Sequence, residues 1–430
     1  MNFFEDAELQ RLRDTLREAA LTNRYLVSDL IEQQGGQTLQ YVDLVMEGGG
    51  TLGIALVGYI YALEQAGLRF LSVGGASVGA IVSLLLACCG EREEEKGEVL
   101  CELLAGMDIA SFVDGGLFPA ALSRLLGSGK AGDKKWQVLL LGLLSSGTIT
   151  KRLGLNPGNA FLNWLTDSLA RFDVHTMADA RARIEHLPIG LTHRERGRNF
   201  ATPTLSLKIV AADITTSSKI IFPEMSPLYW ANPERVNPAL FVRASMSIPG
   251  FFYPMEVSGV SDIIDRSEKW ADLCSFDKEP PDRILFTDGG LLSNFPISLF
   301  HKNRIPNAPT LGARLGSASR AVREIHSVGS YGSGLFKALR HYSDYDFIFQ
   351  NPDYRRLIAH IPTGDHNWLN FNMTEADKLD LFKSGMRTAH EFLESFDWPA
   401  YKELRRAQLE VDRVARRERA VAVADNGATV

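Results

Sequence analysis

The sequence predicts an α/β fold with a mostly parallel sheet, and two observations support this prediction. Apolar stretches of strand length alternate with stretches of helical periodicity along most of the chain, which is the order found where helices connect strands of one sheet. The alternation is clearest between residues 41 and 90, where each of two strands leads through a glycine-containing turn into a helix. Such strand–turn–helix units often form the floor of an active site.

The expected strands are short apolar runs, namely Val42–Met46, Arg69–Val73, Leu205–Asp213, Lys219–Phe222, Arg283–Thr287, Ala308–Arg314 and Arg356–Ile361. The third and fourth runs flank a turn of threonines and serines, which predicts a hairpin. The expected helices between the strands are Gly53–Ala66, Ala80–Cys89, Pro238–Ile248, Gly334–Ile348 and Thr374–Ser395. The last of these begins with Thr374 as N-cap and Asp377 three residues later, close to a capping box. The polar, proline-containing segment Ser258–Asp282 is expected to be a loop.

The first 40 residues are expected to form a helical extension. Glu5–Ala20 carries apolar or small residues at the spacing of an amphipathic helix. Tyr25–Gln34 is expected to be a second helix, which Gly35 and Gly36 would end.

Residues 41–316 are expected to form the core domain, with a helical insertion at about 100–171. Within the insertion, the apolar stretch Trp136–Leu144 is either a core helix or a lid over an acyl-chain pocket. Residues 317–400 are expected to form a C-terminal α/β part packed on the core, and 401–430 a charged helical tail that is partly disordered.

Composition and charge limit the classes of partner. The 430 residues are 45% hydrophobic and 23% charged, with a net charge of −6 and a pI near 5.9, so no overall basic field exists to bind nucleic acid. Four cysteines form neither a disulfide framework nor a metal-binding pair, which favours a reducing compartment, and we expect the cytoplasm. No apolar stretch approaches the roughly 20 residues of a transmembrane helix. We therefore expect any membrane contact to be peripheral.

The first motif is the glycine-rich turn Gly48-Gly49-Gly50-Thr51-Leu52-Gly53, which fits G-x-G-x-x-G between a strand and a helix. A dinucleotide site would need a carboxylate at the end of the next strand, where Val73-Gly74-Gly75 stands instead. The Gly-Lys-[Ser/Thr] of a phosphate-binding P-loop is also absent. N–H groups that lead into a helix favour negative charge, either of a phosphate or of a transient oxyanion. A purely structural tight turn remains an alternative.

The second motif is Gly75-Ala76-Ser77-Val78-Gly79, a G-x-S-x-G elbow between an apolar strand and an apolar helix. A sharp turn of this kind exposes the serine hydroxyl above the sheet, and small flanking residues relieve the crowding. Ser77 is therefore a candidate nucleophile, and the Val78 N–H could help to bind an oxyanion. The alternative is a serine that only caps the helix.

Ser77 would need a general base, and the sequence offers two kinds. No histidine precedes Ser77, so a His-Asp-Ser order is excluded. Of the nine histidines that follow, only His366, in Gly364-Asp365-His366-Asn367, has a distinctive context. The third motif, Asp288-Gly289-Gly290, places a carboxylate at the end of an apolar strand, where α/β sheets bind ligands. An ordinary Asp-Gly turn is the alternative for this motif.

Together the three motifs resemble those of the patatin-like phospholipases, which use a Ser-Asp dyad without histidine. The likeness covers roughly residues 41–314. Gly48–Gly53 is similar to the oxyanion motif of that family, Gly75–Gly79 to its nucleophile elbow, and Asp288–Gly290 to its D-G-[AG] motif. Three longer stretches are similar too, namely Ala211–Phe222, Ala244–Pro254 and Asp288–Pro296. One departure is Leu52, because the family usually has Arg or Lys at this position.

The resemblance implies a three-layer α/β/α fold and a phospholipase A-type serine hydrolase. It implies Ser77 as the nucleophile, Asp288 as the base, and an oxyanion hole from Gly48, Gly49, Gly50, Thr51, Gly53 and Val78. The implied substrate is a glycerophospholipid at a bilayer surface, and no metal or other cofactor is expected. Two alternatives remain: an α/β-hydrolase with a Ser-Asp-His triad, for which His366 is a candidate, and an inactive protein that binds lipid or a partner.

Overall fold

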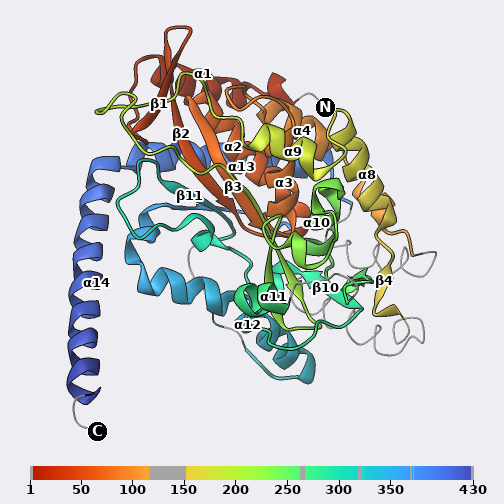
Figure 1. Ribbon diagram of the computed structural model, residues 1–430. Coiled ribbons are helices and arrows are strands. Elements are labelled where there is room, and N and C mark those ends of the chain that lie inside the picture. Colours follow the sequence, from red (N-terminus) through yellow and green to blue (C-terminus); the bar gives the residue numbers. More distant parts are fainter. Residues whose placement is uncertain are drawn as a thin grey trace.

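A twisted sheet, mostly parallel, forms the centre of the computed structural model (Figure 1), which describes residues 3–115, 152–261, 267–317, 322, 324–368, 370 and 372–427. Within these ranges the main sheet has ten strands. Five neighbours run parallel in the order β12 (Ile358–Ile361), β11 (Thr310–Leu315), β2 (Gln37–Met46), β3 (Leu68–Ala76) and β6 (Leu207–Asp213). The predicted α/β fold with a mostly parallel sheet is confirmed.

Antiparallel strands extend this parallel centre. They are β1 (Leu30–Gln34), β5 (Thr192–His193), β7 (Ser218–Phe222), β9 (Met255–Val257) and β10 (Ile284–Asp288). The strands β6 and β7 form the predicted hairpin. A separate pair consists of β4 (Gly154–Asn156) and β8 (Gly250–Phe252).

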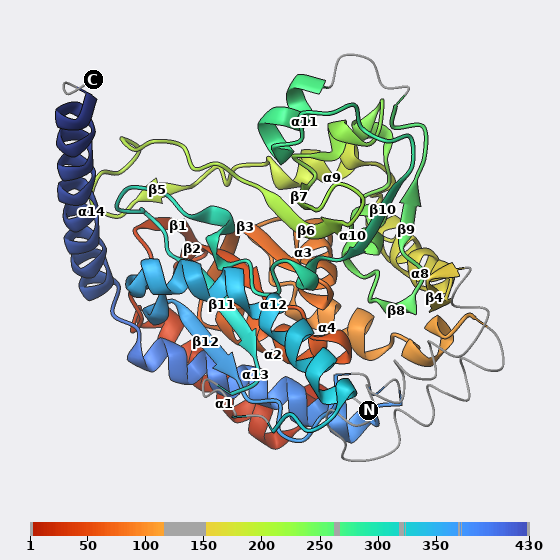
Figure 2. The ribbon, with the colours of Figure 1, turned by 90° about the horizontal axis from the view of Figure 1, so that it is seen from below.

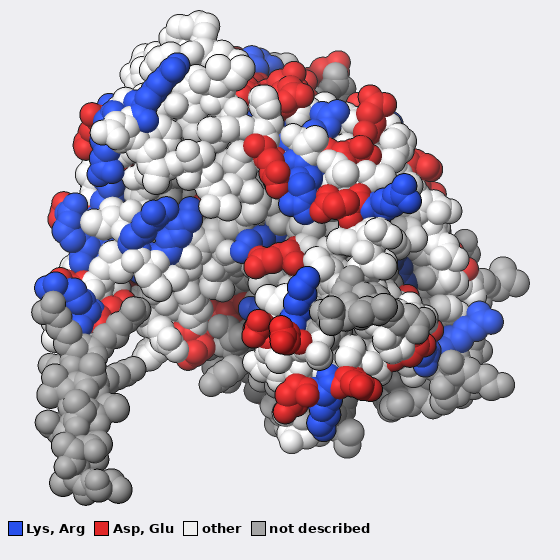
Figure 3. Space-filling model, viewed as in Figure 1, with Lys and Arg blue, Asp and Glu red and all other residues white. Residues whose placement is uncertain are grey.

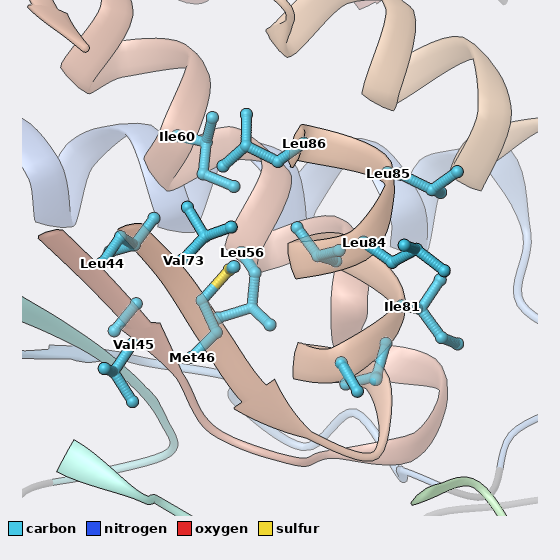
Figure 4. Close-up of a cluster of buried hydrophobic side chains, with 14 of the residues drawn as sticks. Leu44, Val45, Met46, Leu56, Ile60, Val73, Ile81, Leu84, Leu85 and Leu86 are labelled. Carbon is cyan, nitrogen blue, oxygen red and sulfur yellow. The ribbon is translucent and has the colours of Figure 1, made fainter. Parts of the chain in front are cut away.

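One face of the sheet is covered by α2 (Gly53–Gln65), α3 (Val78–Cys88) and α13 (Glu375–Ser395). Every residue of α2 is buried. In Figure 4, side chains of β2 and β3 such as Met46 and Val73 lie against Leu56 of α2 and near those of α3. The helices α2 and α13 pack backbone to backbone, because a Cβ on Gly58 would lie 2.0 Å from Phe382 O.

The opposite face is covered by the segment around residues 295–300 and by α12 (Val328–Gln350), which packs on this segment (Figure 2). A Cβ on Gly74 would lie 2.8 Å from Leu299 Cδ1, and a Cβ on Gly312 would lie 2.6 Å from Phe295 Cζ. The sheet therefore lies between two layers. The remaining longer helices are α1 (Ala7–Leu21), α4 (Gly97–Ala105), α8 (Asn159–Ala170), α9 (Met177–Ile184), α10 (Ala239–Ser245), α11 (Ser267–Cys274) and α14 (Trp398–Gly427).

The expected helix Tyr25–Gln34 is wrong. Leu30–Gln34 is β1, which pairs antiparallel with β2. Gly35 and Gly36 have φ values of 57° and 85°, and two positive φ values in a two-residue loop are typical of a tight hairpin turn. The two glycines therefore reverse a strand instead of ending a helix.

Two other expectations concern connecting segments. Ser258–Asp282 was expected to be a loop, but it contains α11. This helix buries Trp270 completely, and that burial outweighs the polar composition around it. The apolar stretch Trp136–Leu144, interpreted as a core helix or a lid, lies outside the described residues.

The C-terminal elements are close to the prediction. Thr374 caps α13, and its side chain and that of Asp377 form the expected capping box. The helix α14 begins against the body, where Tyr401 and Arg405 contact the buried Asp353, and then extends away from it (Figures 1 and 2).

Charged side chains of both signs are interspersed over much of the face in Figure 3. No helix in the described ranges is both long enough and apolar enough to cross a bilayer.

Candidate active site

Ser77 lies at the sharp turn between β3 and α3. Its backbone has φ 54° and ψ −125°, a conformation that is rare for residues other than glycine. The end of β2 passes close to this turn, since a Cβ on Gly75 would lie 2.6 Å from Met46 O and one on Gly79 only 2.4 Å from the same oxygen. Glycine at both positions therefore allows the elbow to form against β2.

The last residue of α10 and the residue after it contact Ser77 from the other side. The Ser77 N–H donates to Ser245 Oγ at 2.9 Å, and the Ser77 hydroxyl donates to Met246 Sδ at 3.4 Å. Ser245 Oγ in turn donates to Val210 O of β6 at 2.6 Å. Because a thioether is a weak acceptor, the contact with Met246 holds the Ser77 hydroxyl only weakly.

The register of β6 brings Asp288 close to this elbow. The strand β7 pairs with one edge of β6, and both β3 and β10 pair with the other edge. Ala76, the last residue of β3, is paired with Val210, and Asp288, the last residue of β10, is paired with the next residue, Ala211. The carboxyl ends of β3 and β10 therefore meet head to head on one edge of β6.

The Asp288 turn is held by short backbone contacts. The Asp288 carboxylate accepts the Gly290 N–H at 2.7 Å, and the Asp288 N–H donates to Ser247 O at 2.9 Å. A Cβ on Gly289 would lie 1.9 Å from Val210 O, so only glycine fits there. The segment 245–247 thus braces both candidate residues, Ser77 through Ser245 Oγ and Asp288 through Ser247 O.

The glycine-rich turn adjoins both of these elements at Gly48. The Gly48 N–H donates to Asn294 O at 2.9 Å. A Cβ on Gly48 would lie 2.6 Å from Asn294 Oδ1 and 2.9 Å from Ser77 Cβ. Gly48 is therefore the point where the turn, the elbow and the segment after Asp288 come together.

The amides of the glycine-rich turn differ in their partners. Thr51 N–H donates to Trp368 O at 2.9 Å, so this amide and that of Gly48 are both engaged with protein carbonyls. Gly49 and Gly50 lie between them, and Gly50 has a φ of 57°. Gly53 provides close packing, since a Cβ there would lie 2.3 Å from Val78 Cγ2.

The first residue of α3 completes the set of candidate donors. Val78 N–H has no acceptor within α3, as is general for the first turn of a helix. Leu52 is buried, with a relative exposure of 6%. Within the described ranges, His, Cys, Asp and Glu side chains form no group of three or more arranged as metal ligands.

Comparison with known families identifies the class of this chain. The model of the family described as "Patatin-like phospholipase" matches residues 44–301, which is more than half of the 430 residues. The chain belongs to the patatin-like phospholipase family. Membership supports a lipid hydrolase.

Several relatives are similar to this patatin-like chain. The uncharacterized protein YqhO of Bacillus subtilis is 28% identical over 360 residues, which are 83% of this chain and 100% of YqhO. Lysophospholipase nte1 of Aspergillus niger is 50% identical over 46 residues, which are 11% of this chain and 3% of that protein.

Two solved structures are similar at 16% sequence identity. VipD from Legionella pneumophila has a TM-score of 0.41, and the match covers 89% of this chain and 73% of VipD. The ExoU–SpcU complex of Pseudomonas aeruginosa has a TM-score of 0.34, with 90% of this chain and 63% of the matched chain covered.

Two buried carboxylates, which the motifs did not predict, form hydrogen bonds to the segments around the candidate site. Glu47, just before Gly48, accepts the Leu315 N–H at 2.7 Å and Asn294 Nδ2 at 3.0 Å. Asp344 of α12 accepts Ser293 Oγ at 2.6 Å and the Phe295 N–H at 2.8 Å. Burial raises the pKa of Asp344 to about 6. Asp344 therefore holds the segment that follows Asp288 from the opposite layer.

The signals for these supporting residues differ. Ser245, Met246 and Asn294 lie in stretches whose likeness to patatin-like proteins is visible in the sequence. Asp344 and Trp368 lie in no motif and beyond the family match. Only tertiary packing brings these two to the site.

The histidine alternative gains no support from the described contacts of this patatin-like chain. His366 Nε2 lies 3.0 Å from Asp380 Oδ2 on α13. Among the histidines whose side chains the structure describes, none has a hydrogen bond to Ser77.

Proposed function

We propose that the chain is a phospholipase A-type acyl hydrolase that uses Ser77 as nucleophile and Asp288 as general base. The observation that carries the proposal is the head-to-head meeting of β3 and β10 on one edge of β6, which brings the serine elbow and the aspartate turn together. Asp288 would accept the hydroxyl proton while Ser77 Oγ attacks the ester carbonyl carbon. The same proton would pass to the departing alcohol, and water activated by Asp288 would then release the fatty acid.

The oxyanion of each tetrahedral intermediate would be bound by the N–H groups of Gly49, Gly50 and Val78. Gly48 and Thr51 were expected to contribute as well, but their N–H groups already donate to Asn294 O and Trp368 O. Aspartate is a weak base for a serine hydroxyl, so preorganised donors would supply much of the rate acceleration. Losing one such donor typically costs about 10²–10³ in rate.

The substrate we propose is a glycerophospholipid met at a bilayer surface by a cytoplasmic protein. The family match supports a lipid substrate. The four cysteines are all free, which suits a reducing compartment. Fractionation of cells with and without added vesicles would test the peripheral association.

The test of the dyad uses the purified protein and phosphatidylcholine vesicles with distinguishable sn-1 and sn-2 acyl chains. Ser77→Ala and Asp288→Asn should each lower fatty-acid release by about 10⁴-fold or more. A fluorophosphonate probe should label wild type at Ser77 and leave Ser77→Ala unlabelled. Ser83→Ala is the matched control, because Ser83 lies in α3, the helix that follows Ser77, and its hydroxyl donates to Gly79 O.

Three outcomes would count against the proposal. Undiminished hydrolysis by Ser77→Ala or Asp288→Asn contradicts the dyad. A full loss of activity in His366→Ala with an unchanged melting temperature would favour a histidine triad. Wild type that neither hydrolyses lipid nor reacts with the probe would favour a binding protein.

A further inference from the structure

The segment between β12 and α13 contacts the glycine-rich turn directly. Trp368 O accepts the Thr51 N–H at 2.9 Å, and the Thr51 hydroxyl donates to Trp368 O at 3.1 Å and to Asn367 O at 3.3 Å. A Cβ on Gly50 would lie 2.2 Å from Trp368 O and 2.9 Å from Trp368 Cε3. Both the carbonyl and the indole ring of Trp368 therefore lie against the backbone of Gly50 and Thr51.

This contact and the one at Gly48 hold the turn on either side of Gly49 and Gly50. Asn294 O accepts the Gly48 N–H on one side, and Trp368 O accepts the Thr51 N–H on the other. Two glycines have wide conformational freedom, so their amides would point in many directions without such anchors. Because the flanking peptide groups are fixed, the directions of the two intervening N–H groups are restricted.

The Trp368 segment is itself anchored to α13. Ser384 Oγ donates to Pro362 O near the start of the segment, and His366 Nε2 lies 3.0 Å from Asp380 Oδ2. The Asn370 N–H donates to Asn367 O at 2.9 Å, next to Trp368 in the chain. The helix α13 packs backbone to backbone on α2, and α2 starts at Gly53, the last residue of the glycine-rich turn. The anchor and the turn therefore belong to one packed unit.

We propose that Trp368 is a positioning residue that aims the Gly49 and Gly50 N–H groups at the oxyanion. This inference rests on the proposed hydrolase function and extends it to a part of the chain beyond the family match at 44–301. The indole ring packs against Gly50 and thereby holds the carbonyls of residues 367 and 368 within hydrogen-bond distance of Thr51. These hydrogen bonds fix the conformation of the turn. Trp368 makes no bond to the substrate and takes no part in proton transfer.

The test compares kinetics per active site. Active sites are counted with the fluorophosphonate probe, and kcat and KM are then measured on phosphatidylcholine vesicles. Trp368→Ala should lower kcat per labelled site by about 10- to 100-fold with little change in KM, because a misplaced oxyanion donor acts on the transition state. The rate constant of phosphonylation should fall in parallel, since charge also develops on the phosphoryl oxygen. Trp368→Phe, which keeps a ring over Gly50, should restore most of the rate.

A double-mutant cycle isolates the contact. Thr51→Val keeps the shape of the side chain and removes the hydroxyl that donates to the two carbonyls. If Trp368 acts through Thr51, the loss in Trp368→Ala with Thr51→Val should be clearly smaller than the product of the two single losses. Trp164→Ala is the matched control, because Trp164 is also partly buried but packs on Phe112 and Phe161. It should leave kcat per labelled site unchanged.

The outcomes separate this inference from the dyad. Wild-type kcat per labelled site in Trp368→Ala, with fewer labelled sites or a lower melting temperature, would mean that Trp368 only stabilises the fold. Multiplicative losses in the cycle would also overturn the positioning role. An inactive wild type, or an active Ser77→Ala, would instead refute the proposed function on which the inference rests.

Discussion

Gly48 and Asn294 exchange backbone and side-chain hydrogen bonds in both directions. The Gly48 N–H donates to Asn294 O at 2.9 Å, and Asn294 Nδ2 donates to Gly48 O at 3.1 Å. Asn294 follows Asp288 by six residues. The pair therefore couples the aspartate turn to the glycine-rich turn, although the two are more than 200 residues apart in the chain.

Asn294→Asp is expected to break this coupling. The carboxylate keeps the shape of the amide but cannot donate to Gly48 O, and it would face Glu47 Oε1, which now lies 3.0 Å from Nδ2. Loss of the donor in a buried network should lower the free energy of unfolding by about 1–3 kcal/mol, with more from repulsion between the carboxylates. Urea unfolding and kcat per labelled site check both effects. If neither the free energy of unfolding nor kcat per labelled site changed, the pair would contribute neither to stability nor to catalysis.

Ser245→Ala should destabilise the fold and also slow the reaction of Ser77 with the probe. Ser245 Oγ accepts the Ser77 N–H and donates to Val210 O, and both contacts are buried. Without the hydroxyl, the elbow loses its link to β6, and we expect a cost of about 1–3 kcal/mol in stability together with slower phosphonylation of Ser77. The rate constant of probe labelling provides the measurement. Ser226→Ala is a suitable control, because Ser226 is buried but donates only to Pro223 O; equal labelling rates in the two variants would contradict the prediction.

Gly58→Ala should destabilise the packing of α2 on α13. The new Cβ would lie 2.0 Å from the backbone oxygen of Phe382, and backbone atoms cannot move aside as a flexible side chain can. We expect a loss of about 1–3 kcal/mol or more, measured by denaturant unfolding. Gly334→Ala in α12 is the control, since its Cβ would meet only Ile325 Cδ1, at 3.4 Å. Alanine at this position in α12 should raise the free energy of unfolding by about 0.5–1 kcal/mol.

The pH dependence of stability should reveal Asp344. Burial raises the pKa of Asp344 to about 6 in the folded state, from an ordinary value of 3.8. The folded protein therefore binds the proton more tightly than the unfolded chain, and the corresponding stability is fully present below pH 3.8 and is lost as the pH rises to about 6. The whole effect is about 3 kcal/mol.

Asp344→Asn isolates this contribution. Unfolding free energies of wild type and variant would be measured across this pH range, and the wild-type value should fall relative to that of Asp344→Asn as the pH increases. Asn keeps one of the two acceptor oxygens that bind Ser293 Oγ and the Phe295 N–H, so the exchange of the other adds an offset that does not vary with pH. Parallel curves would show that Asp344 does not titrate as stated.

The sequence predicts the elements of the site well where local chemistry is restrictive. The Ser77 elbow needs small residues at 75 and 79 because β2 passes within 2.6 Å or less of any Cβ there. The capping box of Thr374 and Asp377 is equally local. Such positions allow few residue types, so the pattern can be recognised without the fold.

Other features depend on contacts between distant parts of the chain. Gly35-Gly36 can end a helix or reverse a hairpin, and pairing of β1 with β2 decides between them. Trp368 and Asp344 act through packing against the turns at 48–53 and 288–295. Trp368 binds Thr51 through its backbone oxygen, an atom that every residue has. A sequence pattern therefore cannot predict which backbone carbonyl will form a hydrogen bond to a distant loop.

The shared edge of β6 means that the geometry of the proposed dyad is encoded in strand pairing. Successive residues of a strand point to opposite faces of the sheet. If β10 slipped by one residue against β6, the carboxylate of Asp288 would move to the other face, and the buried side chains of Ile284 and Phe286 would leave the core with it. The pairing that buries Ile284 and Phe286 in the main core therefore also keeps the Asp288 carboxylate on the face that the proposed dyad requires.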